Sequence, residues 1–368
     1  MEKFLFLLLI SSITIFAQDS GILIGLGYRE IDSTNSNAGI DPVQKLVTLW
    51  LVKENDKYVC KNDFNELIVP RDTSFFRIGL KRSVYNLWTE DFVWCCPVDE
   101  YSPKIKGIDK LYGENVAGHN ELTIYFVDKK YMSIGADGGT DAASKSSARI
   151  TCWYDSYLIN LDSFVNKEWS DLWDLDCKIP DDLANLFGSK FYDDFITQAQ
   201  CFRDSVENDT SEYSNRGRIE DLPSGISLFR KNGHLVMDAQ FGPKNSVEQG
   251  AYEYFRVNAK LLTELSGGED DSVNWTDIQK KYPKAIDALK SPENNLLLIL
   301  NKDKLLFFNI VDDRVEWTPI YEYKLEGDDH RILMYQWANQ EEVVKWSKKF
   351  SEIEYKIDMD IYDFDVDQ

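Results

Sequence analysis

The sequence has three histidines, and their side chains could act as general bases or metal ligands. His119 lies in the segment GENVAGHNELT, His234 follows an Asn-Gly pair, and His330 lies in EGDDHRIL. The sequence contains no Gly-x-Ser-x-Gly nucleophile motif, no phosphate-binding Gly-Lys-Ser/Thr loop and no His-Glu-x-x-His zinc motif. We therefore assign no catalytic residue, and the question of whether the chain is an enzyme stays open.

Cofactor and metal motifs are equally sparse. The glycines at 21, 25 and 27 are not followed by a helix pattern, so they do not suit a dinucleotide-binding turn. The glycine-rich segment 135–139 lacks the lysine of a phosphate-binding loop. Asp363, Asp365 and Asp367 alternate as at the start of a calcium loop, but no turn glycine or distal glutamate follows them. The sequence therefore predicts neither a cofactor nor a metal site.

Carboxylates are abundant, and if the chain is an enzyme they are the candidate catalytic groups. The sequence has 63 acidic and 41 basic residues, with a net charge of -22. Such a field repels polyanions, so we expect no nucleic-acid binding. Aromatic residues make up 13% of the chain, and rings beside carboxylates could stack on a sugar and accept its hydroxyl hydrogen bonds. A glycosidase needs two carboxylates about 5 to 9.5 Å apart, a pairing that only a fold can reveal.

The cysteines all lie in the first part of the chain. They are Cys60, Cys95, Cys96, Cys152, Cys177 and Cys201. In an exported protein an even number favours disulfides, although the sequence does not select their connectivity. Zinc is not predicted, because there is no Cys-x-x-Cys pair. Cys95 and Cys96 are neighbours in a predicted strand, where consecutive side chains point to opposite faces, so we expect them to have different partners.

The first residues predict export. Residues 1–17 combine a basic start, an apolar run from Phe4 to Ile15 and a small residue, Ala17, before polar Gln18. This order is typical of a secretory signal peptide. No later segment is long and apolar enough to span a bilayer. We therefore expect a soluble periplasmic or extracellular protein, with an uncleaved membrane anchor as the alternative.

Hairpin patterns predict a mainly β protein. In ISLFRKNGHLVMDAQF, residues 226–241, the pair Asn232-Gly233 suits a type I′ turn because both residues tolerate a positive φ. His234 is then the first residue after a turn. Segments starting at residues 46, 122 and 296 also place short polar turns between apolar, β-branched or aromatic runs. The runs 296–300 and 305–308 are continuously apolar, which predicts strands covered on both faces.

Helix patterns are few. They cover residues 180–202, 276–292 and 339–350. Thr276 and Gln279 suit the start of the second, and Pro283 should split it into two short helical pieces. Asn339 and Glu342 have the spacing of a capping box at the start of the third. These helices are expected to be accessory to the sheets.

The fold class predicted is mainly β with a few accessory helices, in two packed β-rich, sandwich-like halves. An irregular β-propeller is the alternative, disfavoured because the hairpins start at unequal intervals. The predicted parts are a signal peptide (1–17), a cysteine-bearing β-rich region (18–205), a linker or long loop (206–225), a cysteine-free β-rich region (226–350) and an acidic tail (351–368). The loop is predicted because segment 206–225 is polar and rich in turn-forming residues.

Two classes of function remain. We favour an exported, soluble β-rich binding or interaction protein whose ligand is an unknown protein or glycan, with no catalysis inferred. The alternative is a secreted hydrolase, with glycans as one substrate class, that uses carboxylates from loops. A cleft with two close carboxylates, at least one of them buried and with a shifted pKa, would favour the hydrolase. Exposed rings without paired acids would favour the binding protein.

Overall fold

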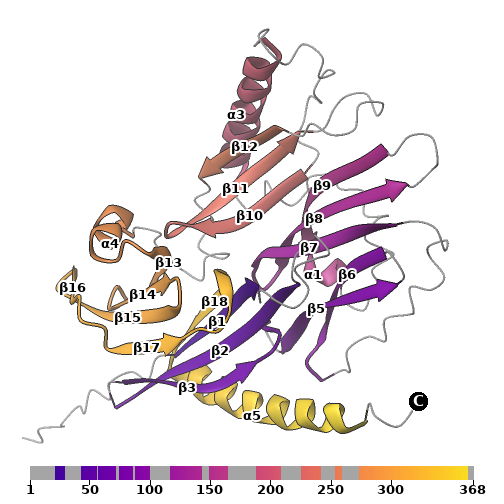
Figure 1. Cartoon of the computed structure of the whole chain (residues 1–368). Coiled ribbons are helices and arrows are strands. Elements are labelled where there is room, and N and C mark those ends of the chain that lie inside the picture. Colours follow the sequence, from indigo (N-terminus) through magenta and orange to yellow (C-terminus); the bar gives the residue numbers. More distant parts are fainter. Residues whose placement is uncertain are drawn as a thin grey trace, which may run out of the picture.

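The computed structural model of the chain is predominantly β (Figure 1). It describes residues 21–29, 43–55, 57–71, 74–85, 88–99, 117–142, 149–164, 188–208, 225–241, 253–258 and 273–363. Within these residues the strands form four sheets, and almost all neighbouring strands are antiparallel. The predicted fold class, mainly β with accessory helices, is confirmed. The predicted signal peptide lies outside the described residues.

The first sheet joins strands from the two ends of the described chain. Its order is β18-β1-β2-β3, and all its pairs are antiparallel. The strands are β1 (Gly21–Arg29), β2 (Gln44–Glu54), β3 (Lys57–Phe64) and β18 (Asp328–Ala338). This sheet therefore combines strands from both predicted regions, 18–205 and 226–350. The division of the chain at 206–225 stays a prediction, because most of that segment lies outside the described residues.

The second sheet is continuous from β4 to β9 in sequence order. Its strands are β4 (Leu67–Pro70), β5 (Phe75–Tyr85), β6 (Trp88–Pro97), β7 (Ala117–Val127), β8 (Tyr131–Ala142) and β9 (Arg149–Asn160). β6 and β7 run parallel over a short stretch, and the other pairs are antiparallel. A propeller would need these strands in separate blades around an axis, so the continuous sheet argues against a regular propeller.

The third and fourth sheets come from the second half of the chain. The third is β10 (Gly225–Lys231), β11 (His234–Phe241) and β12 (Glu253–Asn258). The fourth is β13 (Ala285–Lys290), β14 (Leu296–Asn301), β15 (Lys304–Val311), β16 (Arg314–Val315) and β17 (Tyr321–Lys324), in which β17 also pairs with β15. The four expected hairpins, β2/β3, β7/β8, β10/β11 and β14/β15, are all present.

The turn of the third sheet has the predicted conformation. Asn232 has φ +57° and Gly233 has φ +81°, the positive values that a type I′ turn requires. The strands on either side pair in register from Lys231 with His234 outward. His234 is thus the first residue of β11, as expected.

The helices lie outside the sheets. They are α1 (Leu161–Phe164), α3 (Ser189–Asn208), α4 (Trp275–Lys281) and α5 (Gln340–Asp363). The capping box of α5 is confirmed: Glu342 Oε2 accepts from the Asn339 N–H at 2.9 Å, and Asn339 Oδ1 accepts from the Glu342 N–H at 3.0 Å. In the part of the chain that the structure covers, every helix is too short or too polar to cross a membrane.

Two helix predictions need correction. Residues 285–290 were expected to be a helical piece, but they form β13, because pairing with β14 completes the edge of the fourth sheet. The cap of α4 is Asn274, whose Oδ1 accepts from the Asp277 N–H, and not Thr276. In addition, α5 continues through residues 351–363, so the described part of the predicted acidic tail is helical.

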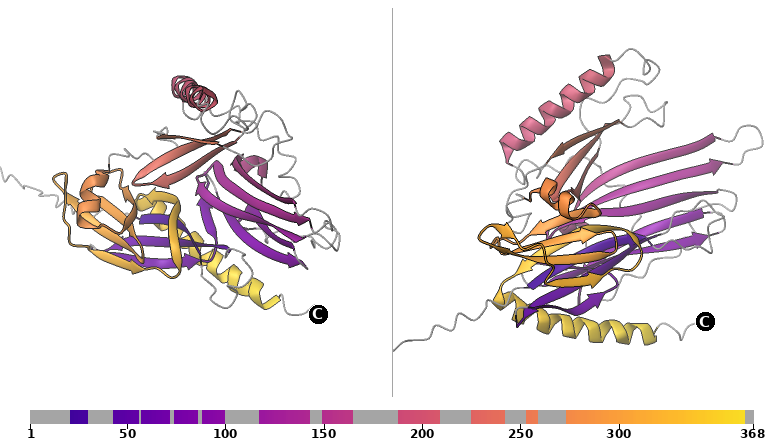
Figure 2. Two further views of the ribbon diagram at one scale, coloured as in Figure 1. Left: turned by 45° about the horizontal axis from the view of Figure 1, so that its top comes forward. Right: turned by 60° about the vertical axis from the view of Figure 1, so that its left-hand side comes forward.

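The first sheet is covered on both faces, as in a sandwich. On one face the fourth sheet lies against the first (Figure 2). Alternate residues such as Ile22 and Leu51 pack there against Leu298 and Phe307 of the fourth sheet. Burying two such apolar faces against each other is the main stabilising term of a β-sandwich. The other alternating set of fourth-sheet residues, including Phe308, packs under α4. The prediction that the apolar runs 296–300 and 305–308 are covered on both faces is therefore confirmed.

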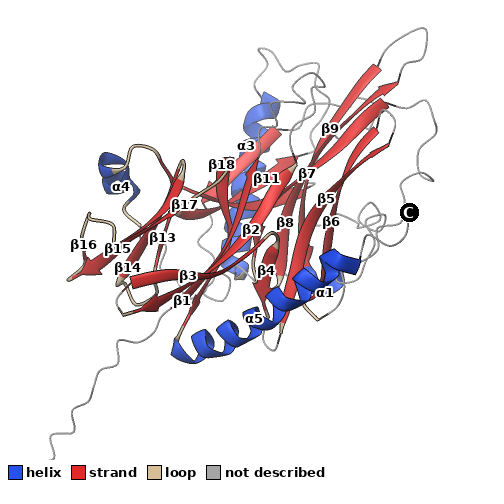
Figure 3. Cartoon of the chain, turned by 60° about the horizontal axis from the view of Figure 1, so that its bottom comes forward, coloured by secondary structure: helices blue, strands red, loops and turns tan. Residues whose placement is uncertain are grey.

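The second face of the first sheet packs against the second sheet and α5 (Figure 3). Trp346 and Phe350 of α5 are buried beside Trp50, with ring centroids 5.5 and 5.4 Å from it. Trp50 Nε1 also donates to Ser347 Oγ at 3.0 Å, which satisfies the polar atom of a fully buried ring. The apolar stripe of α5 is what fastens this helix to the sheet.

The cysteines do not form the predicted disulfides where the structure describes them. Cys60, Cys95 and Cys201 have free thiols. They lie on three different elements, β3, β6 and α3. Burial raises the pKa of Cys95 to about 12, which keeps this thiol protonated. Cys177 lies outside the described residues.

Candidate functional site

Strand β18 is the element on which the sheets converge. Besides its hydrogen-bonded neighbour β1, it contacts β4 and β7 of the second sheet, β10 of the third and β13 of the fourth. Side chains from segments that are far apart in sequence therefore meet along β18. Two buried carboxyl groups lie in this region, those of Asp128 and Asp287.

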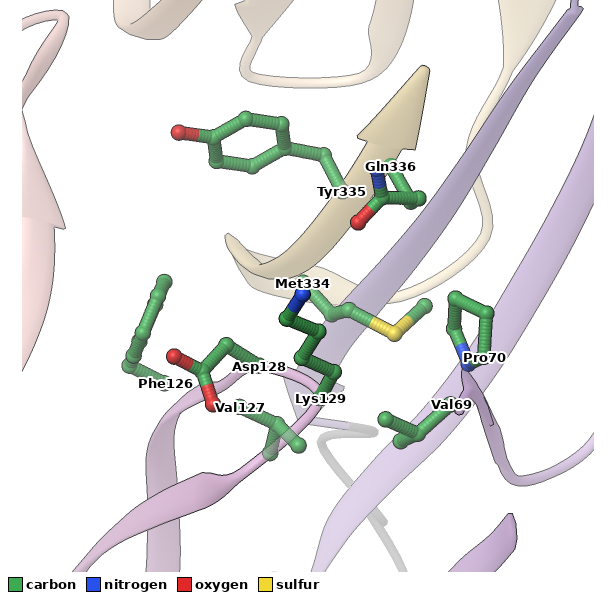
Figure 4. Close-up of a pocket in the computed structure, with 9 residues that line it drawn as sticks. All are labelled: Val69, Pro70, Phe126, Val127, Asp128, Lys129, Met334, Tyr335 and Gln336. Atoms are coloured by element: carbon green, nitrogen blue, oxygen red, sulfur yellow. The ribbon is translucent and has the colours of Figure 1, made fainter. Parts of the chain in front are cut away.

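A small pocket lies between β4, β7 and β18 (Figure 4). Its walls are residues 69–70 of β4, 126–129 at the end of β7 and 334–336 of β18. Its volume is about 10 Å³, which is room for a single water-sized group. The lining combines apolar side chains such as Val69 and Met334 with the side chains of Lys129 and Gln336, and Asp128 is the one acidic residue in it.

The carboxyl group of Asp128 is held through one of its two oxygens. Asp128 follows β7 directly, and its Oδ1 accepts hydrogen bonds from the backbone N–H groups of Lys130 and Tyr131, both at 2.6 Å. The turn also closes through a bond from the Asp128 N–H to the Tyr131 carbonyl oxygen, at 2.9 Å. Oδ2 is buried and has no hydrogen-bond partner. An ionised Asp128 therefore keeps an unsatisfied acceptor in the interior, beside the pocket.

Burial raises the pKa of Asp128 from 3.8 to about 6. Removal from water disfavours the charged form of an acid, and only 8% of this residue is exposed. The hydrogen bonds from Tyr131 and Lys130, and then the positive charges of Lys129 and Arg71, lower the pKa in part. No second carboxyl group contributes to the shift. Asp128 therefore titrates close to neutrality as an isolated buried acid.

The second carboxyl group, that of Asp287, has donors at both oxygens. Arg230 Nε donates to its Oδ2 at 2.9 Å, and the Gly233 N–H donates to its Oδ1 at 2.7 Å. Both charged side chains are almost completely buried, with 1% and 4% of their areas exposed. Such a pair is stable in the interior only when its geometry and remaining hydrogen bonds are satisfied.

Arg230 connects three strands through its other nitrogens. Its Nη2 donates to the Ala288 carbonyl oxygen of β13 at 2.8 Å, and its Nη1 donates to the Tyr335 hydroxyl of β18 at 3.1 Å. Its guanidinium also lies over the Tyr335 ring, 4.8 Å from the centroid. Tyr335 in turn lines the pocket of Asp128, so the two buried acids share one strand.

The histidines do not form a site together with these acids. His330 is buried in β18, with Nδ1 3.2 Å from the Lys302 carbonyl oxygen and Nε2 2.7 Å from the Glu326 carbonyl oxygen, and it stacks on Tyr28. These contacts give it a packing role at a strand end. His119 lies in β7. Among the residues described, no three His, Cys, Asp or Glu side chains gather as metal ligands would.

Among the tryptophans whose side chains the structure describes, some have the core role that strand patterns suggest and others are partly exposed. Trp50 and Trp337 are buried in the first sheet. Trp317 is half-buried at the outer face of the fourth sheet, where its ring lies 5.9 Å from Phe308 and 6.2 Å from Tyr282. Burial, followed by the charge of nearby Glu322, raises the pKa of Tyr282. Partly exposed rings and a carboxylate therefore lie together on this face.

Sequence patterns did not identify Asp128 and Asp287 as site residues. The local sequence places Asp128 in a polar turn and Asp287 in a predicted helix. The run FVDKKY does contain a signal, because an Asp two and three residues before backbone N–H groups can accept from them in an Asx-type turn. That signal predicts the bonds of Oδ1, but it does not predict that β18 covers the turn.

Comparisons with known proteins give no relative whose functional residues could be matched to these. No protein family and no curated protein matches the sequence.

Proposed function

We propose that the chain is an exported β-rich binding or interaction protein whose ligand is a protein or a glycan. The observation that carries this proposal is the isolation of Asp128. Glycoside hydrolysis needs two carboxyl groups about 5 to 9.5 Å apart, whereas Asp128 is the one acidic residue in the wall of its pocket. The pocket around it also holds only one water-sized group. Export is supported by the signal-peptide pattern of residues 1–17.

A glycan is the ligand class that the described surface supports best. The half-buried rings of Tyr282 and Trp317 lie on the outer face of the fourth sheet, with Glu322 close to Tyr282. Rings provide flat apolar area at low entropy cost, and carboxylates accept hydroxyl hydrogen bonds. The alternative ligand is a protein.

Glycan-array binding by the purified full chain, followed by reducing-end release assays on the bound glycans, tests this proposal. We expect binding without hydrolysis, and we expect Trp317→Ala to weaken binding about 5- to 10-fold. Trp94→Ala is the matched control, because Trp94 is also half-buried but lies in the second sheet beside Arg77. Equal loss in both variants, or no glycan bound at all, would reject the glycan version.

A hydrolase remains the second candidate because one buried acid with a pKa of about 6 could act as a general acid. The wild-type chain would then release reducing ends, and Asp128→Asn would not. The rate of release should fall as the pH rises through 6. These results would establish hydrolysis in place of binding alone.

A further inference from the structure

We propose that Asn232 is a deamidation site whose reaction is suppressed in the folded chain by the carboxylate of Asp287, which accepts the backbone N–H of Gly233. Asn232 and Gly233 form the only Asn-Gly pair in the sequence, and they are the two central residues of the β10/β11 turn. This covalent modification of the chain does not depend on whether the ligand is a glycan or a protein.

An Asn-Gly pair is reactive because glycine places no side chain beside the attacking atom. The Gly233 backbone nitrogen attacks Asn232 Cγ and forms a C–N bond, and the side-chain amide leaves as ammonia with the proton that the nitrogen loses. Water then opens the resulting cyclic imide at either of its two carbonyl carbons. The product is aspartate or isoaspartate at position 232, which carries one more negative charge than the original asparagine.

The attacking nitrogen is already engaged in the folded chain. The Gly233 N–H donates to Asp287 Oδ1 at 2.7 Å, and this hydrogen bond is buried. The nitrogen must lose its proton in order to attack, and a hydrogen bond to an anion stabilises the protonated form. A bond to a charged acceptor is also stronger than one between neutral groups. The Asp287 carboxylate therefore lowers the reactivity of this nitrogen.

The backbone of the turn is also held by packing. Gly233 is buried with φ +81°, and a Cβ built on it would lie 3.1 Å from Val273 Cβ. Attack needs the nitrogen and the amide carbon to come within bonding distance in an aligned geometry. Such a movement would disturb the contacts of Gly233 with Asp287 and Val273. Asn232 itself is only half-buried, so solvent has access to this residue for the hydrolysis step.

The Asp287 carboxylate is fixed in turn by Arg230. Arg230 Nε donates to Asp287 Oδ2 at 2.9 Å, and its Nη2 donates to the Ala288 carbonyl oxygen at 2.8 Å. These bonds connect β10, the strand before the turn, to β13 of the fourth sheet. Deamidation at position 232 should therefore be slow while the third and fourth sheets are in contact and faster whenever this contact opens locally.

The product would weaken the same contact. A carboxylate at position 232 adds a negative charge beside the residue that donates to Asp287. Isoaspartate also adds one methylene to the backbone of a two-residue turn, whose conformation fixes the pairing of Lys231 with His234. Once formed, the modification therefore favours the open arrangement in which it arose.

Peptide mapping of the full chain by mass spectrometry, after incubation in mildly alkaline buffer, tests the proposal. The readout is the fraction of the peptide containing residue 232 that shows the mass increase of an amide-to-acid conversion. Arg230→Met/Asp287→Leu removes the acceptor together with its counter-charge. It should deamidate about 10-fold faster than wild type, as the loss of a hydrogen bond to a charged group implies. Arg230→Met/Asp287→Asn keeps a neutral acceptor and should give an intermediate rate.

Phe350→Leu is the control for lowered stability. Phe350 is fully buried and packs against Trp50 of the first sheet rather than against the turn. This variant should be destabilised and yet deamidate at a rate close to that of wild type. Wild-type rates in both double variants, or an equal acceleration in Phe350→Leu, would overturn the proposal.

The neutral-acceptor variant keeps the test decisive if Arg230→Met/Asp287→Leu does not fold. The comparison is then between Arg230→Met/Asp287→Asn and Phe350→Leu. A faster reaction at position 232 in the former supports the role of the Asp287 carboxylate, and equal rates overturn it.

Discussion

Asp287 and Asp128 are two buried acids beside the same strand, β18, and they differ in how many of their carboxyl oxygens have donors. Asp287 accepts from Arg230 at one oxygen and from the Gly233 N–H at the other. Asp128 accepts two backbone N–H bonds at one oxygen and none at the other. A completed set of partners makes the first acid part of the structure that joins β10, β13 and β18. An incomplete set favours the protonated form of the second acid.

The comparison also shows why burial alone does not define a site. Both residues are nearly inaccessible, at 3% and 8% exposed. What separates them is the counter-charge: Arg230 lies within hydrogen-bonding distance of Asp287, whereas Lys129 affects Asp128 only as a nearby charge. The cost of burying a carboxylate is offset in one place and left uncompensated in the other.

The largest effect is expected from breaking the completed pair. Arg230→Met leaves Asp287 buried without its counter-charge and should lower the free energy of unfolding by about 3–5 kcal/mol. Urea denaturation followed by tryptophan fluorescence measures this. The double variant Arg230→Met/Asp287→Leu removes both charges and should recover most of the loss. A single variant that unfolds at the wild-type urea concentration would show that the pair does not hold the sheets together.

Asp128→Asn, in contrast, should raise the free energy of unfolding at neutral pH. The folded-state pKa of about 6 exceeds the ordinary value of 3.8, so the folded chain holds this proton more tightly than the unfolded chain. The associated stability is fully present below about pH 3.8 and is lost as the pH rises through 6. Two pH units correspond to about 3 kcal/mol. Because the neutral amide makes weaker hydrogen bonds, we expect Asp128→Asn to be about 1–3 kcal/mol more stable than wild type at pH 7.5.

Urea denaturation of both proteins from pH 4 to 8 provides the measurement. The advantage of Asp128→Asn over wild type should grow between pH 4 and 6 and then stay constant. A difference that does not change across this range would contradict the shifted pKa.

A smaller effect is expected at the turn that donates to Asp287. Gly233 has φ +81°, and an added Cβ would lie 3.1 Å from Val273 Cβ. Gly233→Ala should therefore cost about 1–2 kcal/mol from backbone strain, together with a crowding contribution. Gly188 is a matched control, because it has φ +79° with nothing within 4 Å of an added Cβ. If Gly188→Ala costs as much as Gly233→Ala in the same denaturation assay, the contact with Val273 contributes nothing.

The smallest effect is expected from Lys129→Gln. The positive charge of Lys129 lowers the pKa of Asp128 only as a minor contribution, so its removal should raise that pKa by less than about one unit. The midpoint of the pH-dependent stability change in wild type should move upward accordingly, with Lys129→Arg unchanged. A downward movement would mean that the sign of this electrostatic contribution is wrong.

Much of the fold was predictable because it depends on local patterns. The Asn232-Gly233 turn, the two-sided apolar runs at 296–300 and 305–308, and the Asn339 and Glu342 capping box all follow from conformational preferences of adjacent residues. Residues 285–290 show the limit of such patterns. Their local sequence suits a helix, but strand pairing with β14 determines their structure.

The candidate site was less predictable because it depends on contacts between distant segments. Asp128 becomes buried because β18, near the other end of the described chain, lies against its turn. Asp287 finds Arg230 only after the third and fourth sheets have come together. No local pattern contains these pairings. The sequence therefore indicated only a polar turn at Asp128 and a helix at Asp287.

The most direct test of the difference between the two acids is a carbon-detected NMR titration of the Asp128 carboxyl group, assigned by the loss of its signal in Asp128→Asn. We expect a single midpoint near pH 6. A midpoint close to the ordinary value of 3.8 would mean that Oδ2 is solvated or paired, and the distinction between an open and a completed buried acid would be wrong.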